Sequence, residues 1–183
     1  MAHRNMQSIA DALARQGIAT LRFDFPFIEA GRRRVDSREV ATAAIEAAVA
    51  DARGRSPLPL WLGGHSFGGR MATHAVLDRM LAVAGLILCS FPLHAAGRPS
   101  TERAAHLSSI DLPTLFLSGT RDALAEPQLL GPLVAALPRA ELHWLDTADH
   151  GYRVLARTRG SREDVFAEMA RAARGFVERH ATG

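Results

Sequence analysis

Residues 60–70 have the sequence LWLGGHSFGGR, and this segment constrains the fold of the chain more than any other. An apolar run of strand length leads into it, and apolar residues at helical spacing follow it. Glycine two residues to either side of a serine is the G-x-S-x-G pattern of a sharp strand-to-helix turn, where larger side chains would collide. Such a turn lifts the serine hydroxyl clear of a sheet and points a helix N-terminus at it. The segment predicts Ser66 as a nucleophile, Gly64 and Gly68 as the glycines of its elbow, and the backbone N–H of Phe67 as an oxyanion donor.

Strand and helix patterns alternate along the whole chain. They predict, in order, a helix over residues 6–16, a strand over 18–25, a helix over 38–53, a strand over 58–63, a helix over 68–80, strands over 83–90 and 114–118, a helix over 127–137, a strand over 140–145 and a helix that starts at a cap in 161–164 and ends near residue 180. Continuous apolar runs of this length are typical of parallel strands covered by helices on both faces. The alternation predicts one α/β domain over residues 1–183, with a doubly wound, mostly parallel sheet of about five strands and no lid domain.

A serine hydroxyl is a weak nucleophile unless a base lies beside it, and the chain supplies a candidate base. His150 follows the predicted strand over 140–145, where its imidazole can reach back over the carboxyl edge of a parallel sheet. Asp122 follows the strand over 114–118 and stands between Ser66 and His150 in chain order. The three residues predict a catalytic triad in which His150 takes the serine proton and Asp122 orients the imidazole.

Other interpretations of these residues stay open at this point. Asp146 and Asp149 are nearer to His150 in sequence, and either is the alternative acid, although both fit turn positions. His94 follows a strand pattern and is an alternative functional histidine, whereas the remaining histidines are interpreted as structural or solvent-facing. The glycine-rich turn does not match a phosphate-binding loop, because arginine follows its last glycine where that motif needs lysine and then serine or threonine.

Composition limits the classes of partner. All 22 basic residues are arginine, 19 acidic residues nearly balance them, and the formal net charge is +3. The one basic run, at residues 32–34, has no interleaved aromatic residues and predicts a solvated loop rather than a nucleic-acid site. The single cysteine, Cys89, excludes an internal disulfide, and no cluster of ligand residues suggests a metal. We therefore expect no metal or other cofactor, no nucleic-acid or membrane binding, and a cytoplasmic location.

The chain resembles a known family in five segments. They have the sequences RFDFP (22–26), GHSFGGR (64–70), FPLH (91–94), SGTRD (118–122) and DH (149–150). These segments are similar to the small, lidless branch of the α/β-hydrolase superfamily near the dienelactone-hydrolase-like proteins, whose relatives include a testis-expressed protein and a subunit of a chromatin acetyltransferase complex. The resemblance covers nearly the whole chain and implies an esterase-like fold and triad. It implies little about the substrate.

The start of the chain departs from that family. The family fold opens with a strand and a glycine-containing loop that donates the second oxyanion N–H, and this strand lies between those expected here over 18–25 and 58–63. Residues 1–17 contain no such segment, so we expect an N-terminally short domain. Residues 18–25 should then either pair with the strand over 58–63 or be separated from it by a gap one strand wide. Neighbouring strands of a sheet lie about 4.8 Å apart, and this spacing sets the width of the gap. We expect the short chain alone to be poorly stable and slow as an enzyme. Adding roughly 20–30 upstream residues, about one strand and its loop, should restore both its stability and its turnover rate.

Together these features predict a serine hydrolase that cleaves small ester or related acyl substrates through an acyl-enzyme intermediate. An open, apolar acyl pocket is expected, with walls formed by Phe25, Phe27, Phe67, Phe91 and Leu93. The connection over residues 90–112 is too short for a lid, which favours short-chain aryl esters over long-chain lipids. The alternative function is a catalytically silent scaffold of the same fold that binds a protein partner.

Overall fold

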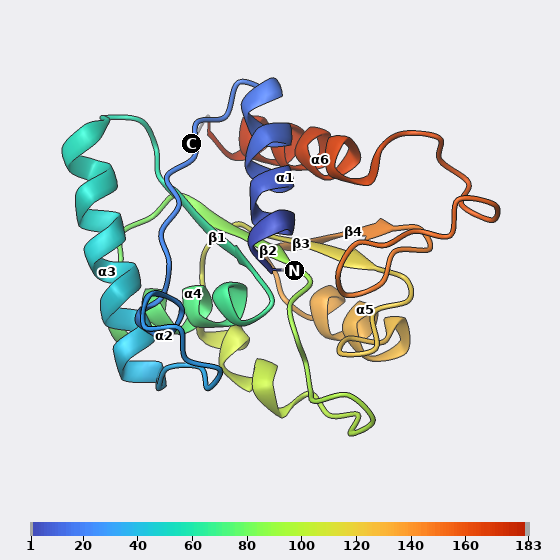
Figure 1. The fold of residues 1–183 in the computed structure, drawn as a ribbon, viewed down its shortest axis with the longest axis horizontal. Helices are drawn as coiled ribbons and strands as arrows, with labels where there is room; N and C mark the ends of the chain where they lie inside the picture. Colours follow the sequence, from blue (N-terminus) through green and yellow to red (C-terminus); the bar gives the residue numbers. More distant parts are fainter. Residues whose placement is uncertain (1, 182–183) are drawn as a thin grey trace.

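A computed structural model of the chain describes residues 2–181 and contains one parallel sheet of four strands (Figure 1). The strands are β1 (Trp61–His65), β2 (Gly85–Cys89), β3 (Thr114–Gly119) and β4 (Ala140–Leu145). They lie side by side in chain order, β1-β2-β3-β4, and every neighbouring pair is parallel. All four strands therefore end at the same edge of the sheet, which is where loops of parallel α/β sheets carry ligand-binding residues.

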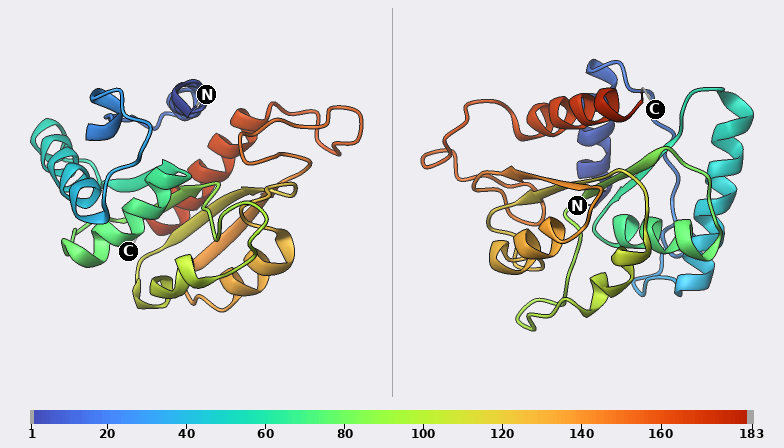
Figure 2. Two further views of the ribbon diagram at one scale, coloured as in Figure 1. Left: turned by 60° about the horizontal axis from the view of Figure 1, so that its bottom comes forward. Right: turned by 180° about the vertical axis from the view of Figure 1, so that it is seen from behind.

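Helices cover both faces of this sheet, as Figure 2 shows from two sides. The helical segments are α1 (Ala2–Arg15), α2 (Pro26–Glu29), α3 (Arg38–Arg55), α4 (Phe67–Asp78), the 3₁₀ segment η1 (Glu102–Ser109), α5 (Pro127–Ala135) and α6 (Val165–His180). Helices α1 and α6 pack against each other on one face, and α4, α5 and η1 lie on the other, with α3 packed against α4. The predicted α/β class with helices on both faces is confirmed, with four strands in place of about five.

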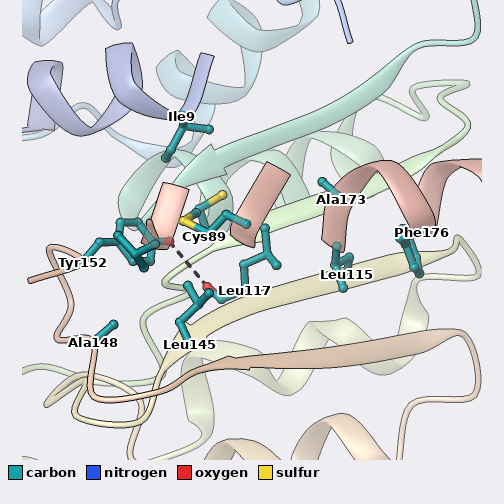
Figure 3. Packing of buried hydrophobic residues seen from close by; sticks show 11 residues of the cluster. Ile9, Cys89, Leu115, Leu117, Leu145, Ala148, Tyr152, Ala173 and Phe176 are labelled. Carbon is teal, nitrogen blue, oxygen red and sulfur yellow. Dashed lines mark hydrogen bonds between the residues drawn. The ribbon is translucent and has the colours of Figure 1, made fainter. Parts of the chain in front are cut away.

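Alternate residues of the central strands fill the two faces. In β2, Leu88 packs with residues of α4 and α5, whereas Cys89 packs with residues of α1 and α6. Figure 3 shows the second of these clusters, in which Phe176 of α6 covers the sheet and the hydroxyl of Tyr152 donates to the carbonyl of Leu117 at 3.4 Å. Successive strand residues point to opposite faces, so a strand covered on both faces needs an unbroken apolar run. This requirement is why β2 and β3 are recognisable in the sequence.

The strand predicted over residues 18–25 is wrong. These residues follow α1 without strand structure, and among the described residues β1 pairs only with β2. Of the two outcomes expected for this segment, pairing with β1 does not occur. A cavity of about 240 Å³ lies beside β1, and its lining includes residues 18–23, residues 60–64 and parts of α1, α3 and α6. An apolar segment becomes a strand only where a neighbour offers backbone partners, and β1 does not pair with residues 18–25.

The connection between β2 and β3, residues 90–113, is made of bends, turns and η1 and adds no lid domain. It is tied to the loop after β3, because the N–H of Leu93 donates to the carbonyl of Leu124 at 2.9 Å. Across residues 2–181, no helix has both the length and the apolar character needed to cross a membrane.

Candidate active site

Three loops at the carboxyl edge of the sheet bring together the residues predicted as a triad. Ser66 follows β1, Asp122 follows β3 and His150 follows β4. The Nε2 atom of His150 lies 2.8 Å from Ser66 Oγ, and its Nδ1 atom lies 2.9 and 2.8 Å from the two carboxylate oxygens of Asp122. A carboxylate beside Nδ1 favours the tautomer that carries its proton there, which leaves Nε2 free to accept the hydroxyl proton of Ser66.

Ser66 has a strained backbone between β1 and α4. Its φ of 54° and ψ of −115° lie outside the regions that residues with a side chain normally occupy. Hydrogen bonds hold it on both sides, because its N–H donates to the carbonyl of Cys89 at 2.8 Å and its carbonyl accepts from the N–H of Arg70 at 3.1 Å. The hydroxyl makes no capping bond to α4, so it is directed to His150 instead.

Backbone packing inside this turn requires glycine at Gly64 and Gly69. A Cβ on Gly64 would lie 2.7 Å from the carbonyl carbon of Gly68, and a Cβ on Gly69 would lie 2.7 Å from the carbonyl oxygen of Gly64. A Cβ on Gly68 would instead meet the ring of Phe25 at 3.7 Å, an ordinary contact. The steric reason given for Gly64 is confirmed, and the one given for Gly68 is wrong. The first turn of α4 presents Gly69, not Gly68, to the end of β1.

The loops that carry the candidate acid and base are joined to each other. The N–H of Arg121 donates to the carbonyl of Ala148 at 2.9 Å. Gly119 makes this approach possible, since a Cβ there would stand 2.2 Å from the same carbonyl oxygen. The side chain of Asp122 is fully buried and its Oδ1 also accepts from the N–H of Leu124 at 2.8 Å. Sequence reasoning missed Gly119, although a glycine at the end of a strand often marks a close backbone approach.

The two alternative acids are held in turns. Asp149 Oδ1 accepts backbone N–H groups from residues two and four positions later, each at 2.9 Å. Asp146 Oδ2 accepts from the N–H of Gly160 at 2.8 Å. The carboxylate that contacts His150 Nδ1 is that of Asp122, so the geometry favours Asp122 as the acid.

The segment after β2 turns into the core instead of lining a pocket. Phe91 and Leu93 are 1% and 0% exposed and belong to the cluster of buried residues beneath α4 and α5. The structure therefore corrects their assignment as walls of an acyl pocket. His94 is also buried, with its Nε2 in contact with a carboxylate oxygen of Glu126, and this pairing gives it a structural environment.

An aromatic group lies next to Ser66. The ring centroids of Phe25 and Phe27 are 5.3 and 5.8 Å from that of Phe67, and all three side chains are half-buried. The cavity beside β1 reaches Gly64 but does not include Ser66 among its lining residues. The predicted pocket is thus reduced to Phe25, Phe27 and Phe67, whose rings pack together.

The backbone N–H of Phe67 is available to an anion. Phe67 is the first residue of α4, where N–H groups have no carbonyl partner within the helix and the helix dipole favours negative charge. This placement fits the predicted oxyanion donor. Within the described part of the chain, no group of three or more His, Cys, Asp or Glu side chains is placed to hold a metal ion.

A second histidine, His65, also belongs to this site and was missed at the level of the sequence. It is the last residue of β1, and its Nε2 lies 2.9 Å from the carbonyl oxygen of His150. Burial lowers the pKa of His65, so its ring is neutral near pH 7 and can donate to that carbonyl from Nε2. The only signal in the sequence is its position inside the G-x-S-x-G segment.

Comparisons with known proteins agree with this fold. A family model described as an alpha/beta hydrolase domain matches residues 1–178. A lidless α/β serine hydrolase from Xanthomonas campestris has a TM-score of 0.70 at 23% identity, over 96% of this chain and 73% of that one. An esterase domain from Rhodothermus marinus has a TM-score of 0.69 at 20% identity, over 96% and 80%. A dienelactone hydrolase from Anabaena variabilis has a TM-score of 0.69 at 17% identity, over 96% and 79%. The finer placement near the testis-expressed and chromatin-complex relatives stays a prediction.

Proposed function

Because this chain belongs to the alpha/beta hydrolase domain family, we propose that it is a serine hydrolase that cleaves small ester or related acyl substrates through an acyl-enzyme on Ser66. The observation that carries the proposal is the run of hydrogen bonds from Ser66 Oγ through both ring nitrogens of His150 to the buried carboxylate of Asp122. A nucleophile, a base in contact with it and an acid behind the base are the parts that activate a serine hydroxyl.

Acylation begins when Ser66 Oγ attacks the carbonyl carbon of the substrate and transfers its proton to His150 Nε2. Asp122 stabilises the imidazolium that forms, and the N–H of Phe67 donates to the carbonyl oxygen as negative charge collects there. The bond from carbon to the leaving alcohol then breaks. The departing alkoxide takes the proton from His150 Nε2, and the acyl group remains as an ester of Ser66.

Deacylation repeats these steps with water as the nucleophile. His150 Nε2 accepts a proton from the water as its oxygen attacks the acyl carbon, and the N–H of Phe67 again donates to the oxygen that carries negative charge in the second tetrahedral intermediate. Ser66 Oγ leaves and takes the proton back from Nε2. The products are a carboxylic acid, an alcohol and the regenerated enzyme.

Substrates are small or loosely held on this proposal. The aromatic group of Phe25, Phe27 and Phe67 offers an apolar surface beside the nucleophile, and the connection between β2 and β3 provides no lid to enclose a long chain. We expect p-nitrophenyl acetate and butyrate to be cleaved with higher kcat/KM than the palmitate, without interfacial activation. A strong preference for emulsified long-chain triglyceride would contradict this.

Labelling with a fluorophosphonate probe tests the proposal directly, because the probe reacts covalently with activated serines. The labelled peptide, found by mass spectrometry, should contain Ser66, and Ser66→Ala should abolish both labelling and ester cleavage. Ser108→Ala is the matched control, since this serine is exposed on η1. We expect it to leave both labelling and ester cleavage unchanged. Labelling that persists in Ser66→Ala would sink the assignment.

A catalytically silent scaffold that binds a protein partner is the second candidate. The observation that favours it is that Phe67 N–H is the one oxyanion donor recognised beside Ser66. Loss of one such donor typically costs about 10²–10³ in rate, which slows turnover but leaves attack on a reactive probe measurable. A folded wild-type protein that takes up no probe after prolonged incubation would favour the scaffold over the enzyme.

A further inference from the structure

We propose that His65 is a positioning residue whose Nε2–H holds the backbone carbonyl of His150 and so fixes the imidazole of His150 over Ser66. The inference rests on the proposed function of that site. Its starting observation is a 2.9 Å contact between His65 Nε2 and the carbonyl oxygen of His150, two residues that lie 85 positions apart in the chain.

The donor side of this contact belongs to the rigid part of the fold. His65 is the last residue of β1 and stands opposite Cys89 of β2, so the sheet fixes its backbone. Its ring centroid lies 5.3 Å from that of His150 and 5.4 Å from that of Tyr152. His65 therefore packs against side chains of the loop as well as bonding to its backbone, and the two contacts leave its ring little freedom.

The acceptor side belongs to an irregular loop between β4 and α6. The carbonyl of His150 is held by His65, and the next carbonyl, that of Gly151, accepts from Asn5 Nδ2 of α1 at 3.1 Å. Two consecutive peptide groups of the loop are thus anchored by side chains from two different elements. Anchoring at this point matters for the base, because a misplacement of 1 Å can cost about 10²-fold in rate.

The charge of His65 suits this role. Burial is the main cause that lowers its pKa, so the ring that donates to His150 is neutral near pH 7. A cation at this position would stand close to the imidazolium that forms on His150 during the reaction and would disfavour it. The site needs a donor without charge, and glutamine is a second side chain of that kind because its Nε2 amide can reach a similar point.

Three variants separate positioning from packing. His65→Phe keeps a ring of similar size but removes the donor, His65→Gln restores a neutral donor, and His74→Phe is the matched control on α4, outside the proposed catalytic machinery. We expect His65→Phe to lower kcat for p-nitrophenyl acetate by about 10–100-fold with KM unchanged. We expect His65→Gln to recover most of that loss and His74→Phe to match the wild type.

Hydrogen exchange of the backbone amides in residues 149–153 gives a second readout that does not depend on turnover. Exchange should be faster than wild type in His65→Phe and near wild type in His65→Gln. Wild-type kcat and wild-type exchange in His65→Phe would overturn the proposal, and so would a His65→Gln variant as impaired as His65→Phe in both measurements. If the wild-type protein cleaves no ester and takes up no probe, the proposed function fails. The exchange rates alone then decide whether His65 anchors the loop.

Discussion

Gly68 and Gly69 are neighbours at the start of α4, yet a methyl group would meet different surroundings at each. We expect Gly69→Ala to lower the free energy of unfolding by about 1–3 kcal/mol, because the new Cβ would press on the backbone of Gly64. It should also slow labelling of Ser66. Gly68→Ala should leave both properties near wild type, since only the ring of Phe25 is near. Urea denaturation and probe labelling measure the two effects. Equal destabilisation by both substitutions would show that the steric assignment is wrong.

The role of the Asp122 carboxylate can be tested by a single substitution. Asp122→Asn keeps the size of the side chain but no longer favours a proton on His150 Nδ1, so we expect kcat to fall by about 10⁴-fold with the fold retained. Asp146→Asn is the matched control, because its oxygen can still accept from the N–H of Gly160. Steady-state kinetics on one ester check the pair. Full activity in Asp122→Asn together with loss of activity in Asp146→Asn would show that Asp146, not Asp122, is the acid of the triad.

The positions of Ser66, Asp122 and His150 could be predicted because each follows a recognisable strand, and parallel strands end at one edge. Phe91 and Leu93 could not be placed in the same way. They also follow a strand, but the direction of the chain beyond it depends on a bond from Leu93 to a loop about thirty residues later. A sequence pattern contains no record of such a contact.

At the scale of whole elements, residues 18–25 have the apolar sequence pattern of a strand but do not form one. Helices α3 and α6 and strand β4 form close to their predicted bounds, since helices satisfy their own backbone groups and β4 has β3 beside it. Among the described residues, none pairs with residues 18–25, and a cavity is lined by residues of this segment and of β1. Local pattern predicts which segments can become strands, whereas pairing decides which of them do.

The N-terminal caps of α6 and α3 offer a test at the same scale. Asp164 Oδ1 accepts from the N–H groups of Phe166 and Ala167 at 3.0 and 3.1 Å, whereas Ser37 Oγ accepts one N–H at 3.4 Å. We expect Asp164→Ala to cost about 1–2 kcal/mol and Ser37→Ala less, because more is lost at the better-bonded cap. Urea denaturation of both variants measures the difference. A larger loss in Ser37→Ala would contradict this ranking.

At the scale of the whole molecule, stability depends on pH through a stacked pair of imidazoles between α4 and η1. The rings of His74 and His106 have centroids 3.8 Å apart. Burial is the main cause that lowers the pKa of each to about 4. For His74 the neighbouring His106 lowers the pKa further, Arg38 and Arg70 lower the pKa of both rings, and Asp78 opposes these effects. A histidine in the unfolded chain titrates near 6.5, about the value of a model peptide. As the pH falls below that value the unfolded chain binds more protons than the folded protein, so stability is lost between about pH 6.5 and 4.

We therefore expect the free energy of unfolding to decrease from pH 7 to pH 5, measured by urea denaturation at both values. His106→Phe keeps a ring stacked on His74 but removes one titrating group, so its decrease should be smaller than that of the wild type. The prediction fails if His106→Phe loses as much stability over this range as the wild type does.

The strained backbone of Ser66 means that selection for thermal stability and selection for catalytic activity favour different residues at this position. Glycine enters φ values above zero at little cost, so Ser66→Gly would relieve about 1–3 kcal/mol of strain while it removes the hydroxyl. A library of variants screened for survival at high temperature alone would therefore enrich glycine at this position and lose the proposed nucleophile. A screen that also demands turnover would keep serine, and its survivors would have to gain their heat resistance elsewhere in the molecule.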